Sequence, residues 1–168
     1  RLNAGESDIT FTVPCASIIF IDIVRFSEYT VNLNPAQIMA NLSTIFQSFD
    51  KACLQYPSIT KIKLIGDVYM AAGGLFNKNE EDVSHAVDVV KFGLNAINCI
   101  DESNILLESS LQVRIGVNTA GPIIAGVLGK DKPVFDIIGD PINVAARLQS
   151  TAIPNTVQIS EKTYEIIQ

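Results

Sequence analysis

The stretch SIIFIDIVRFSEYT, residues 17–30, places an aspartate inside a run that otherwise reads as a core β-strand. Residues 18–23 would be continuously apolar without Asp22. A carboxylate at the end of a buried strand is costly to bury unless a cation or a hydrogen-bond donor pairs with it. A local alternative exists, because Asp is a preferred N-cap residue and Asp22 could cap a helix that follows. If it is not a cap, Asp22 indicates a binding site at the strand end.

The composition is that of an ordinary globular domain. The chain has 168 residues, of which 48% are hydrophobic and 18% charged. This length fits one core, so we expect a single domain over residues 1–168. Because the chain does not begin with methionine, we expect it to be cut from a longer protein.

Charge and cysteine content restrict the partners and the cellular compartment that fit this sequence. The formal net charge is -6 and no Lys or Arg cluster forms a polyanion-binding stripe, which argues against nucleic-acid partners. Three unclustered cysteines fit free thiols in a reducing compartment. No apolar run approaches the ~20 residues of a membrane span, so any membrane contact would come from regions outside this chain. We expect a cytoplasmic domain, either of a fully cytoplasmic protein or of a membrane-anchored one.

Hydrophobic periodicity predicts the order of the elements. Hairpins interleaved with helices favour an α+β sandwich with a mostly antiparallel sheet over a doubly wound parallel sheet. The predicted elements are a strand at 15–23, a short helix near Glu28, a helix at 34–56, strands at 59–65 and 68–75 around the turn Gly66-Asp67, a helix at 80–100, strands at 111–118, 122–127 and 134–138, a helix from Pro141 capped by Asp140, a strand near Val157 and a helix from Glu161.

The helix predicted at 80–100 carries the only histidine. Its apolar stripe is expected to bury Val83, Val87, Val90, Leu94 and Ile97. His85 lies among acidic neighbours and is expected on the solvated surface, so the sequence gives little support to a His-dependent triad or a zinc site.

Two aspartates are candidates for holding a cation. Asp22 ends a buried strand and Asp67 occupies a hairpin tip, so both carboxylates reach one sheet edge if the two elements are neighbours. Two negative charges at such a short distance repel each other unless a cation lies between them. Hard oxygen ligands favour Mg²⁺ or Mn²⁺. The alternative for Asp67 is the ordinary turn preference of Gly-Asp.

Other polar residues have both a functional and an ordinary interpretation. Asn143 and Arg147 lie four apart on one predicted helix face and together suit a phosphate group, or they form a solvated face. Lys63 is expected on the opposite strand face from its neighbours Ile62 and Leu64, where a lysine is most often merely exposed.

One apparent phosphate-loop motif lacks the residues that such a loop requires. Residues 126–130 resemble a phosphate loop, but its first glycine would fall at Ile124 and Asp131 replaces the required Ser or Thr.

Four blocks of sequence resemble consecutive signatures of class III nucleotidyl cyclase catalytic domains. Their order and spacing agree with that family, and the resemblance covers roughly residues 13–166. The blocks are FIDIVRFS (20–27), KIKLIGDVYMAAGG (61–74), RIGVNTAGPIIAGVLG (114–129) and FDIIGDPINVAARLQS (135–150).

The resemblance implies a ferredoxin-like fold, similar to polymerase palm domains, and a head-to-tail dimer with a second copy or a paralogous cyclase domain. It also implies that each site draws its metal aspartates from one chain and its other residues from the partner. The residue roles that it implies are two Mg²⁺ or Mn²⁺ ions held by Asp22, Asp67 and the Ile23 carbonyl, β- and γ-phosphates cradled by the turn through Val24, Arg25, Phe26 and Ser27, ribose and α-phosphate contacts from Asn143 and Arg147, and a triphosphate contact from Arg114.

The resemblance also places Lys63 and Asp136 at the positions that read the base. Lys63 can donate to adenine N1 and Asp136 can accept from N6, whereas guanine reverses both groups. We therefore predict an adenylate cyclase that converts ATP to cyclic AMP and pyrophosphate. The alternatives are a guanylate cyclase and a catalytically weak regulatory or dimerisation domain.

One feature departs from the family pattern. Family members usually continue past the last helix into a further hairpin with a basic, triphosphate-contacting residue, whereas this chain stops at Gln168. We expect the fragment to be weakly active or inactive without that hairpin, because one cationic phosphate contact is lost.

Overall fold

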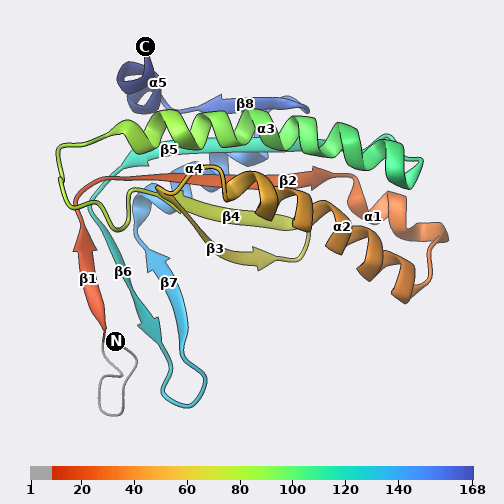
Figure 1. Cartoon of the computed structure of the whole chain (residues 1–168), viewed down its shortest axis with the longest axis horizontal. Coiled ribbons are helices and arrows are strands. Elements are labelled where there is room, and N and C mark those ends of the chain that lie inside the picture. Colours follow the sequence, from red (N-terminus) through yellow and green to blue (C-terminus); the bar gives the residue numbers. More distant parts are fainter. Residues whose placement is uncertain (1–8) are drawn as a thin grey trace.

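The computed structural model describes residues 9–168 and has the predicted α+β architecture (Figure 1). Its elements are β1 (Thr10–Val13), β2 (Ala16–Val24), α1 (Phe26–Tyr29), a 3₁₀ turn (Thr30–Asn32), α2 (Pro35–Cys53), β3 (Ile59–Ile65), β4 (Val68–Gly73), α3 (Ser84–Leu107), β5 (Gln112–Ala120), β6 (Ile123–Leu128), β7 (Val134–Ile138), α4 (Asp140–Ser150), β8 (Thr156–Ile159) and α5 (Glu161–Ile167). No helix in the described range is long and apolar enough to cross a bilayer.

Two sheets organise these elements. The central sheet has the order β3-β4-β2-β5-β8 and is antiparallel except for the parallel pair of β5 and β8. The second sheet has the order β1-β6-β7 and extends away from the helices as an arm (Figure 1). Strand β1 was not predicted, and the predicted strand at 15–23 is β2, displaced by one residue at each end.

The central strand β2 is buried on both faces, which explains its nearly continuous apolar sequence. Ile19, Ile21 and Ile23 belong to the core cluster that includes α2 and α3. Ile18 and Phe20 belong to a second cluster, formed with α4 and the arm. Each face of the central sheet therefore has its own hydrophobic core.

The hairpin of β3 and β4 forms around Gly66-Asp67 as predicted. Ile65 pairs with Val68. Gly66 has a φ of +59°, which a glycine adopts without steric cost at the first central position of a hairpin turn.

Helix α3 begins and ends later than predicted, and it buries a different face. The predicted stripe is only partly correct, because Val90 and Ile97 pack against the core but Leu94 is 52% exposed. The fully buried residues of the helix include Ala86, Phe92 and Ala96. The reason is a close approach at Gly93, where an added Cβ would lie 3.1 Å from Val157 and 3.4 Å from Ile115. Small residues let this helix face pack directly on the sheet, and the large aliphatic residues expected inside lie at its sides.

His85 is buried rather than solvated, so that prediction was also wrong. The residue is 1% exposed, and its Nδ1 lies 2.7 Å from the Ser17 hydroxyl. The Ser17 hydroxyl also contacts Thr119, which accepts a hydrogen bond from Thr163 of α5. The acidic neighbours misled the prediction, because they face solvent while the ring turns inward to this polar chain.

The start of α4 differs from the prediction in one detail. Gly139, with a φ of +150°, is the N-cap, and no side chain caps the helix. Asp140 is instead the first helical residue, with Pro141 at the start of the helix as expected.

Burial of His85 predicts a pH-dependent contribution to stability. Burial lowers the pKa of His85 from its ordinary 6.5, although Asp82 and Asp88 oppose the shift. The unfolded chain therefore binds the proton more tightly, and stability that is fully present above about pH 6.5 is lost as the pH falls below that value toward the lower pKa of the folded state. Urea unfolding of the wild type and His85→Gln between pH 8 and 5 should show the wild type losing more stability.

Comparing the two proteins at each pH removes the contribution of the other titrating groups, which they share. Equal pH dependence in both proteins would contradict a neutral, buried His85.

Candidate active site

The end of β2 brings the two predicted carboxylates together. Asp22 pairs with Val68 of β4 on one side and with Arg114 of β5 on the other. Asp67 directly precedes Val68, and its carbonyl oxygen accepts a hydrogen bond from the Ile23 backbone N–H at 3.3 Å. The N-cap alternative for Asp22 is excluded, because α1 begins at Phe26 with Arg25 as its N-cap.

The electrostatics of this sheet end favour a bound cation. The pKa of Asp22 is raised to about 6, mainly by burial and then by the charge of Asp67, while Arg114 and a hydrogen bond from Gln149 oppose the rise. The negative charge of Asp22 is therefore only partly balanced by neighbouring positive groups and hydrogen-bond donors. Two carboxylates beside the Ile23 carbonyl form an oxygen-rich set that suits a hard divalent ion. No group of three or more His, Cys, Asp or Glu suited to a metal occurs within residues 9–168.

The predicted phosphate turn follows directly. Val24 and Phe26 are buried and anchor the turn in the core. Arg25 between them has a φ of +56°, and both Arg25 and Ser27 are exposed. The backbone thus reverses beside the carboxylates while its side chains alternate between core and solvent.

Helix α4 packs closely on the face of the central sheet that carries Asp22, and a glycine in the sheet permits this contact. A Cβ at Gly116 of β5 would lie 2.2 Å from the Gln149 backbone nitrogen and 2.6 Å from the Ala145 oxygen, so only glycine permits this approach. The Gln149 amide consequently reaches the Asp22 carboxylate at 3.3 Å. Sequence reasoning missed Gln149, and no local pattern marks it.

Asn143 and Arg147 share an exposed face of α4, as predicted. Asn143 is six residues and Arg147 two residues before Gln149, so at 100° per residue they lie about 240° and 200° around the helix from it. Since Gln149 faces Asp22 of its own chain, Asn143 and Arg147 point away from that carboxylate.

Lys63 and Asp136 form an ion pair between β3 and the arm. The Lys63 ammonium lies 2.9 Å from Asp136 Oδ2, and the two side chains are 39% and 17% exposed. The other carboxylate oxygen accepts a hydrogen bond from the Ile137 N–H at 2.8 Å. The structure therefore joins the two residues predicted to read the base.

A β-bulge in β3 was not predicted and changes which way its side chains point. Lys61 pairs with Ala71 and Lys63 with Met70, so Ile62 is the extra residue. Ile62 packs against the same cluster as Met70, and the expectation that it lies opposite Lys63 was wrong. The bulge also places the two lysines on opposite faces of the sheet, which alternation alone would forbid.

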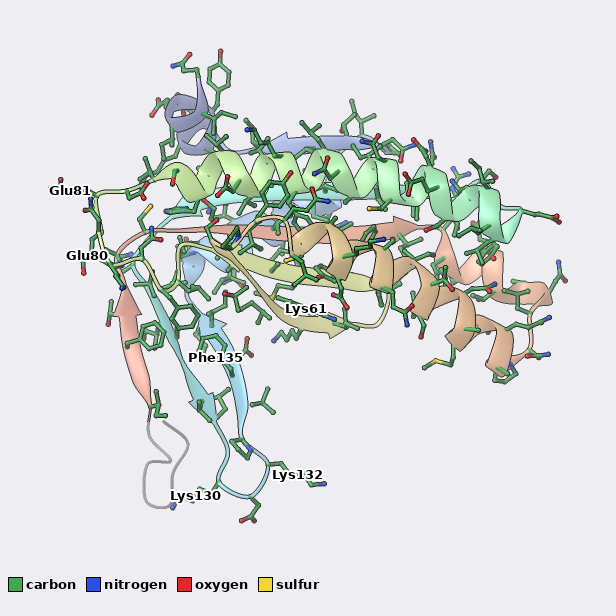
Figure 2. All side chains as sticks on the ribbon, viewed as in Figure 1. Lys61, Glu80, Glu81, Lys130, Lys132 and Phe135 are labelled. Carbon is green, nitrogen blue, oxygen red and sulfur yellow. The ribbon has the colours of Figure 1, made fainter. Side chains whose placement is uncertain are left out.

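The rejected phosphate loop is part of the arm. Residues 126–130 run along β6 into the turn toward β7, and no helix follows them there. Lys130 and Lys132 lie at the tip of the arm, well away from the central sheet (Figure 2).

The site residues therefore fall into two groups on one chain. The first group is Asp22, Ile23, Asp67 and Arg114 with the turn 24–27. The second is Lys63, Asp136, Asn143 and Arg147. No hydrogen bond or ion pair connects the groups among the described side chains.

This fold and these residues define a nucleotidyl cyclase domain. Residues 11–168 match the family model of the adenylate and guanylate cyclase catalytic domain, and the chain belongs to that family. Curated relatives include the germination-specific adenylate cyclase of Dictyostelium discoideum, 34% identical over 99% of this chain and 19% of its own length. Guanylate cyclase 2G of Rattus norvegicus is 32% identical over 97% of this chain and 15% of its own length. The chain thus spans a small part of these relatives.

Solved structures agree with the fold. The guanylate cyclase domain of RhGC from Catenaria anguillulae, in complex with GTP, superposes with a TM-score of 0.84 at 28% identity, covering 94% of this chain and 84% of that one. The adenylyl cyclase CyaB from P. aeruginosa has the same TM-score of 0.84 at 25% identity, covering 95% and 82%. Both nucleotide specificities therefore occur among similar proteins.

Because the negative charge of Asp22 is only partly balanced, removing it should stabilise the fold in the absence of divalent cations. Asp22→Asn keeps an oxygen for the Gln149 amide but removes the repulsion from Asp67. We expect a gain of about 1 kcal/mol at pH 7.5, discounted because the group is partly exposed to solvent. Chemical denaturation in the presence of a chelator measures this gain.

Asp136→Asn is the matched control, because its carboxylate is paired with Lys63 and its charge is compensated. The control should not be stabilised. Destabilisation of Asp22→Asn would contradict an under-compensated carboxylate.

Proposed function

We propose that this domain is an adenylate cyclase, which converts ATP to 3′,5′-cyclic AMP and pyrophosphate. The Lys63–Asp136 ion pair carries the choice of ATP. Its ammonium is a donor and its carboxylate an acceptor, fixed 2.9 Å apart on two different strands. Adenine offers an acceptor at N1 and a donor at N6, so both groups find a partner on one base edge.

Guanine presents the opposite pattern at these two positions. Its N1–H would face the ammonium and its O6 would face the carboxylate. A site built from paired hydrogen-bonding groups rejects a mismatched ligand by up to ~10⁴–10⁵-fold, because buried polar groups are left unpaired.

The reaction needs little from the protein beyond positioning and charge. The ribose 3′-oxygen attacks the α-phosphorus, a P–O bond forms, and the bond to the leaving pyrophosphate breaks, while the 3′-hydroxyl proton passes to solvent. Asn143 orients the ribose, and the Arg147 guanidinium meets the charge that develops on the α-phosphate. Arg114 and the backbone from Ile23 to Ser27 bind the triphosphate.

Asp22, Asp67 and the Ile23 carbonyl would hold divalent ions, two Mg²⁺ or Mn²⁺ in our proposal. When bound, these ions supply positive charge that neutralises the triphosphate and lowers the pKa of the 3′-hydroxyl. The under-compensated charge of Asp22 supports this assignment.

We also propose that the site is completed by a second cyclase domain, paired head to tail. Asn143 and Arg147 point away from the carboxylates of their own chain. The carboxylates of one chain would therefore receive Asn143 and Arg147 from its partner. The arm offers an apolar face for such a partner, with Ile124, Leu128, Val134 and Ile138 between 50% and 56% exposed. This partner is a second copy or a paralogous domain, and the whole protein is a longer chain with this domain in the cytoplasm.

Guanylate cyclase is the second candidate. Several similar proteins are guanylate cyclases, among them guanylate cyclase 2G and the soluble subunit beta-2 of Rattus norvegicus. Lys63 and Asp136 argue against it, because guanylate cyclases of this family typically carry Glu and a small residue there. A silent regulatory domain is the third candidate, which the intact set of proposed site residues disfavours.

Product analysis tests the proposal. The domain, and a version extended at its C-terminus, incubated with ATP or GTP and Mn²⁺ should form cyclic AMP in preference to cyclic GMP. Lys63→Ala should lower the ATP preference by at least about tenfold, because adenine N1 loses its donor. Chromatography with mass detection identifies the products.

Cyclic GMP as the main product would establish the second candidate instead. No cyclic nucleotide from either version, with dimers present, would establish the silent domain.

A shared site predicts complementation between inactive variants. Asp22→Ala lacks the first group and Arg147→Ala lacks the second, so each homodimer has two defective sites. Mixing them creates heterodimers with one site that draws an intact group from each chain. Cyclic AMP formation should recover to roughly a quarter of the wild-type rate at equal mixing, since half the dimers are mixed and each has one working site.

Mixing Asp22→Ala with Asp67→Ala is the control, because both changes damage the same group. Heterodimers shown by differently tagged chains, without recovered activity, would contradict the shared arrangement.

A further inference from the structure

Behind the base-reading lysine, on the other face of the sheet, lies a polar cluster outside the site described above. The Lys61 ammonium lies 3.0 Å from Asp50 Oδ1 and 3.2 Å from Oδ2, so α2 is tied to β3. The buried Tyr69 of β4 donates its hydroxyl to Asp50 Oδ1 at 2.7 Å. The Lys61 ammonium also lies 5.3 Å from the centre of the Tyr69 ring. Three elements thus meet at one carboxylate.

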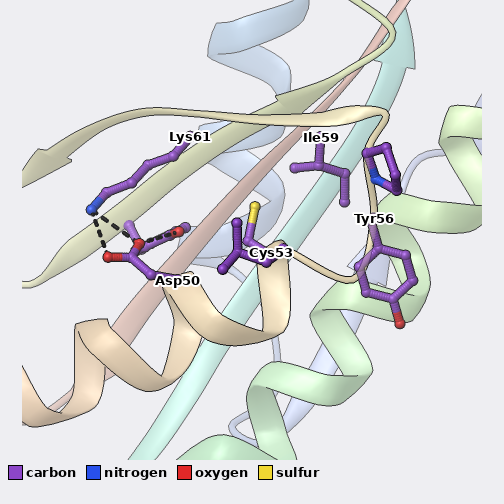
Figure 3. Close-up of a pocket in the computed structure, with 8 residues that line it drawn as sticks. Asp50, Cys53, Tyr56, Ile59 and Lys61 are labelled. Carbon is purple, nitrogen blue, oxygen red and sulfur yellow. Dashed lines mark hydrogen bonds and ion pairs between the residues drawn. The ribbon is translucent and has the colours of Figure 1, made fainter.

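This cluster borders a cavity of about 440 Å³ (Figure 3). The close-up shows Lys61 extending toward Asp50, with Cys53 and Ile59 further along the wall. The ion pair is open to water, with side-chain exposures of 37% for Lys61 and 43% for Asp50. A partly exposed pair contributes only about 0–1 kcal/mol to stability, so its presence calls for a reason other than folding.

The register of β3 supplies that reason. At the turn, Ile65 pairs with Val68, and regular pairing continues back to Lys63 opposite Met70. At the other end, Lys61 pairs with Ala71. The pairing registers at the two ends of β3 differ by one residue, and the extra residue is Ile62 in the bulge.

Without the bulge, the pairing set by the turn would place Lys61 opposite Ala72. Ala72 belongs to the cluster on the Lys63 side of the sheet, whereas Ala71 belongs to the α2 side. A regular β3 would therefore put both lysines on the face that carries Asp136. The second ammonium would compete for the carboxylate that is proposed to accept from adenine.

Two contacts hold the first half of β3 in the bulged register. Ile59 is 8% exposed and packs in the core with α2. The Lys61–Asp50 pair is the contact adjacent to the bulge. It keeps the Lys61 charge on the α2 face, directly behind the position where Lys63 turns to the other side.

We propose that Lys61 and Asp50 are positioning residues for nucleobase selection, because their ion pair fixes the β-bulge that keeps the Lys61 ammonium off the face where Lys63 and Asp136 meet the base. Neither residue touches the nucleotide. The inference rests on the proposed role of Lys63 and Asp136 in reading adenine, and it extends specificity to the opposite face of the sheet.

The decisive variants are Asp50→Asn, which frees the Lys61 ammonium, and Lys61→Met, which removes both the ion pair and the ammonium. Asp50→Asn should lower the ratio of kcat/KM for ATP over GTP about tenfold, mainly through KM for ATP, because the freed ammonium competes for the Asp136 carboxylate and the base contact is uniform binding. Lys61→Met should retain the wild-type ratio, because it leaves no second ammonium to compete. Affinities for the non-cyclising 3′-deoxy-ATP and 3′-deoxy-GTP should change in the same way.

Ser58→Ala is the matched control. Ser58 precedes β3 and its hydroxyl donates to Asp88 at 2.8 Å, so the change removes a polar contact near the same strand without touching the bulge. It should leave the nucleotide ratio unchanged. Hydrogen exchange provides a readout independent of catalysis, since amides at 62–65 should exchange faster in Lys61→Met than in Ser58→Ala.

The outcomes separate this inference from the proposed function. Asp50→Asn that matches the wild type in nucleotide ratio would overturn the positioning role, while Lys63→Ala with a changed ratio leaves the proposed function in place. A wild-type ratio in Lys63→Ala would overturn both. An equal loss of ATP and GTP turnover in Asp50→Asn, together with lowered thermal stability, would show a purely structural role and would also overturn the inference.

Discussion

The pairing of β2 between β4 and β5 is the constraint on which the rest of the structure depends. It places Asp22 in register with Val68 and Arg114, and therefore beside the hairpin tip that carries Asp67. Because β2 is buried on both faces, its register cannot shift by one residue without moving isoleucines between two separate cores. The position of one carboxylate is thus fixed by the packing of the whole sheet.

The two faces of that sheet serve different purposes. The α2 and α3 face is closed, with a core of aromatic and aliphatic residues and a buried polar chain from His85 to Thr163. The α4 and arm face carries the charged groups, and it leaves apolar side chains of the arm exposed. The bulge at Ile62 joins the two faces, because it lets one short strand place a lysine on each. Stability is concentrated on one side, and the proposed chemistry on the other.

Local patterns predicted the features that depend on nearby residues. The β3–β4 hairpin, the exposed face of Asn143 and Arg147, and the α+β class all follow from turn chemistry and periodicity. The errors arose where distant segments decide the outcome. Gly93 brings the backbone of α3 close to the sheet, so the face that packs there is not the stripe of large aliphatic residues that periodicity predicted. The inward turn of His85 depends on Ser17, which is 68 residues away in the sequence.

The candidate site shows the same division. Resemblance to a family named its residues and paired Lys63 with Asp136, but the direct ion pair between them needed three dimensions, because the two are 73 residues apart in the sequence. Gln149 and the bulge had no local signal. The Asp50–Tyr69 contact had a weak one, since strand alternation places Tyr69 inward and a buried phenol requires a partner.

Helix α4 gives the strongest reason to regard this chain as half of a working unit. The contact at Gly116 fixes both its distance from the sheet and its rotation, because a helix that touches a strand backbone has no room to turn. With Gln149 held on Asp22, Arg147 lies about 200° around the helix from it and is exposed to solvent. In the proposed dimer, each chain carries two incomplete groups that face different directions. A two-fold arrangement would complete both groups at once, because whatever one chain lends to its partner it receives in return.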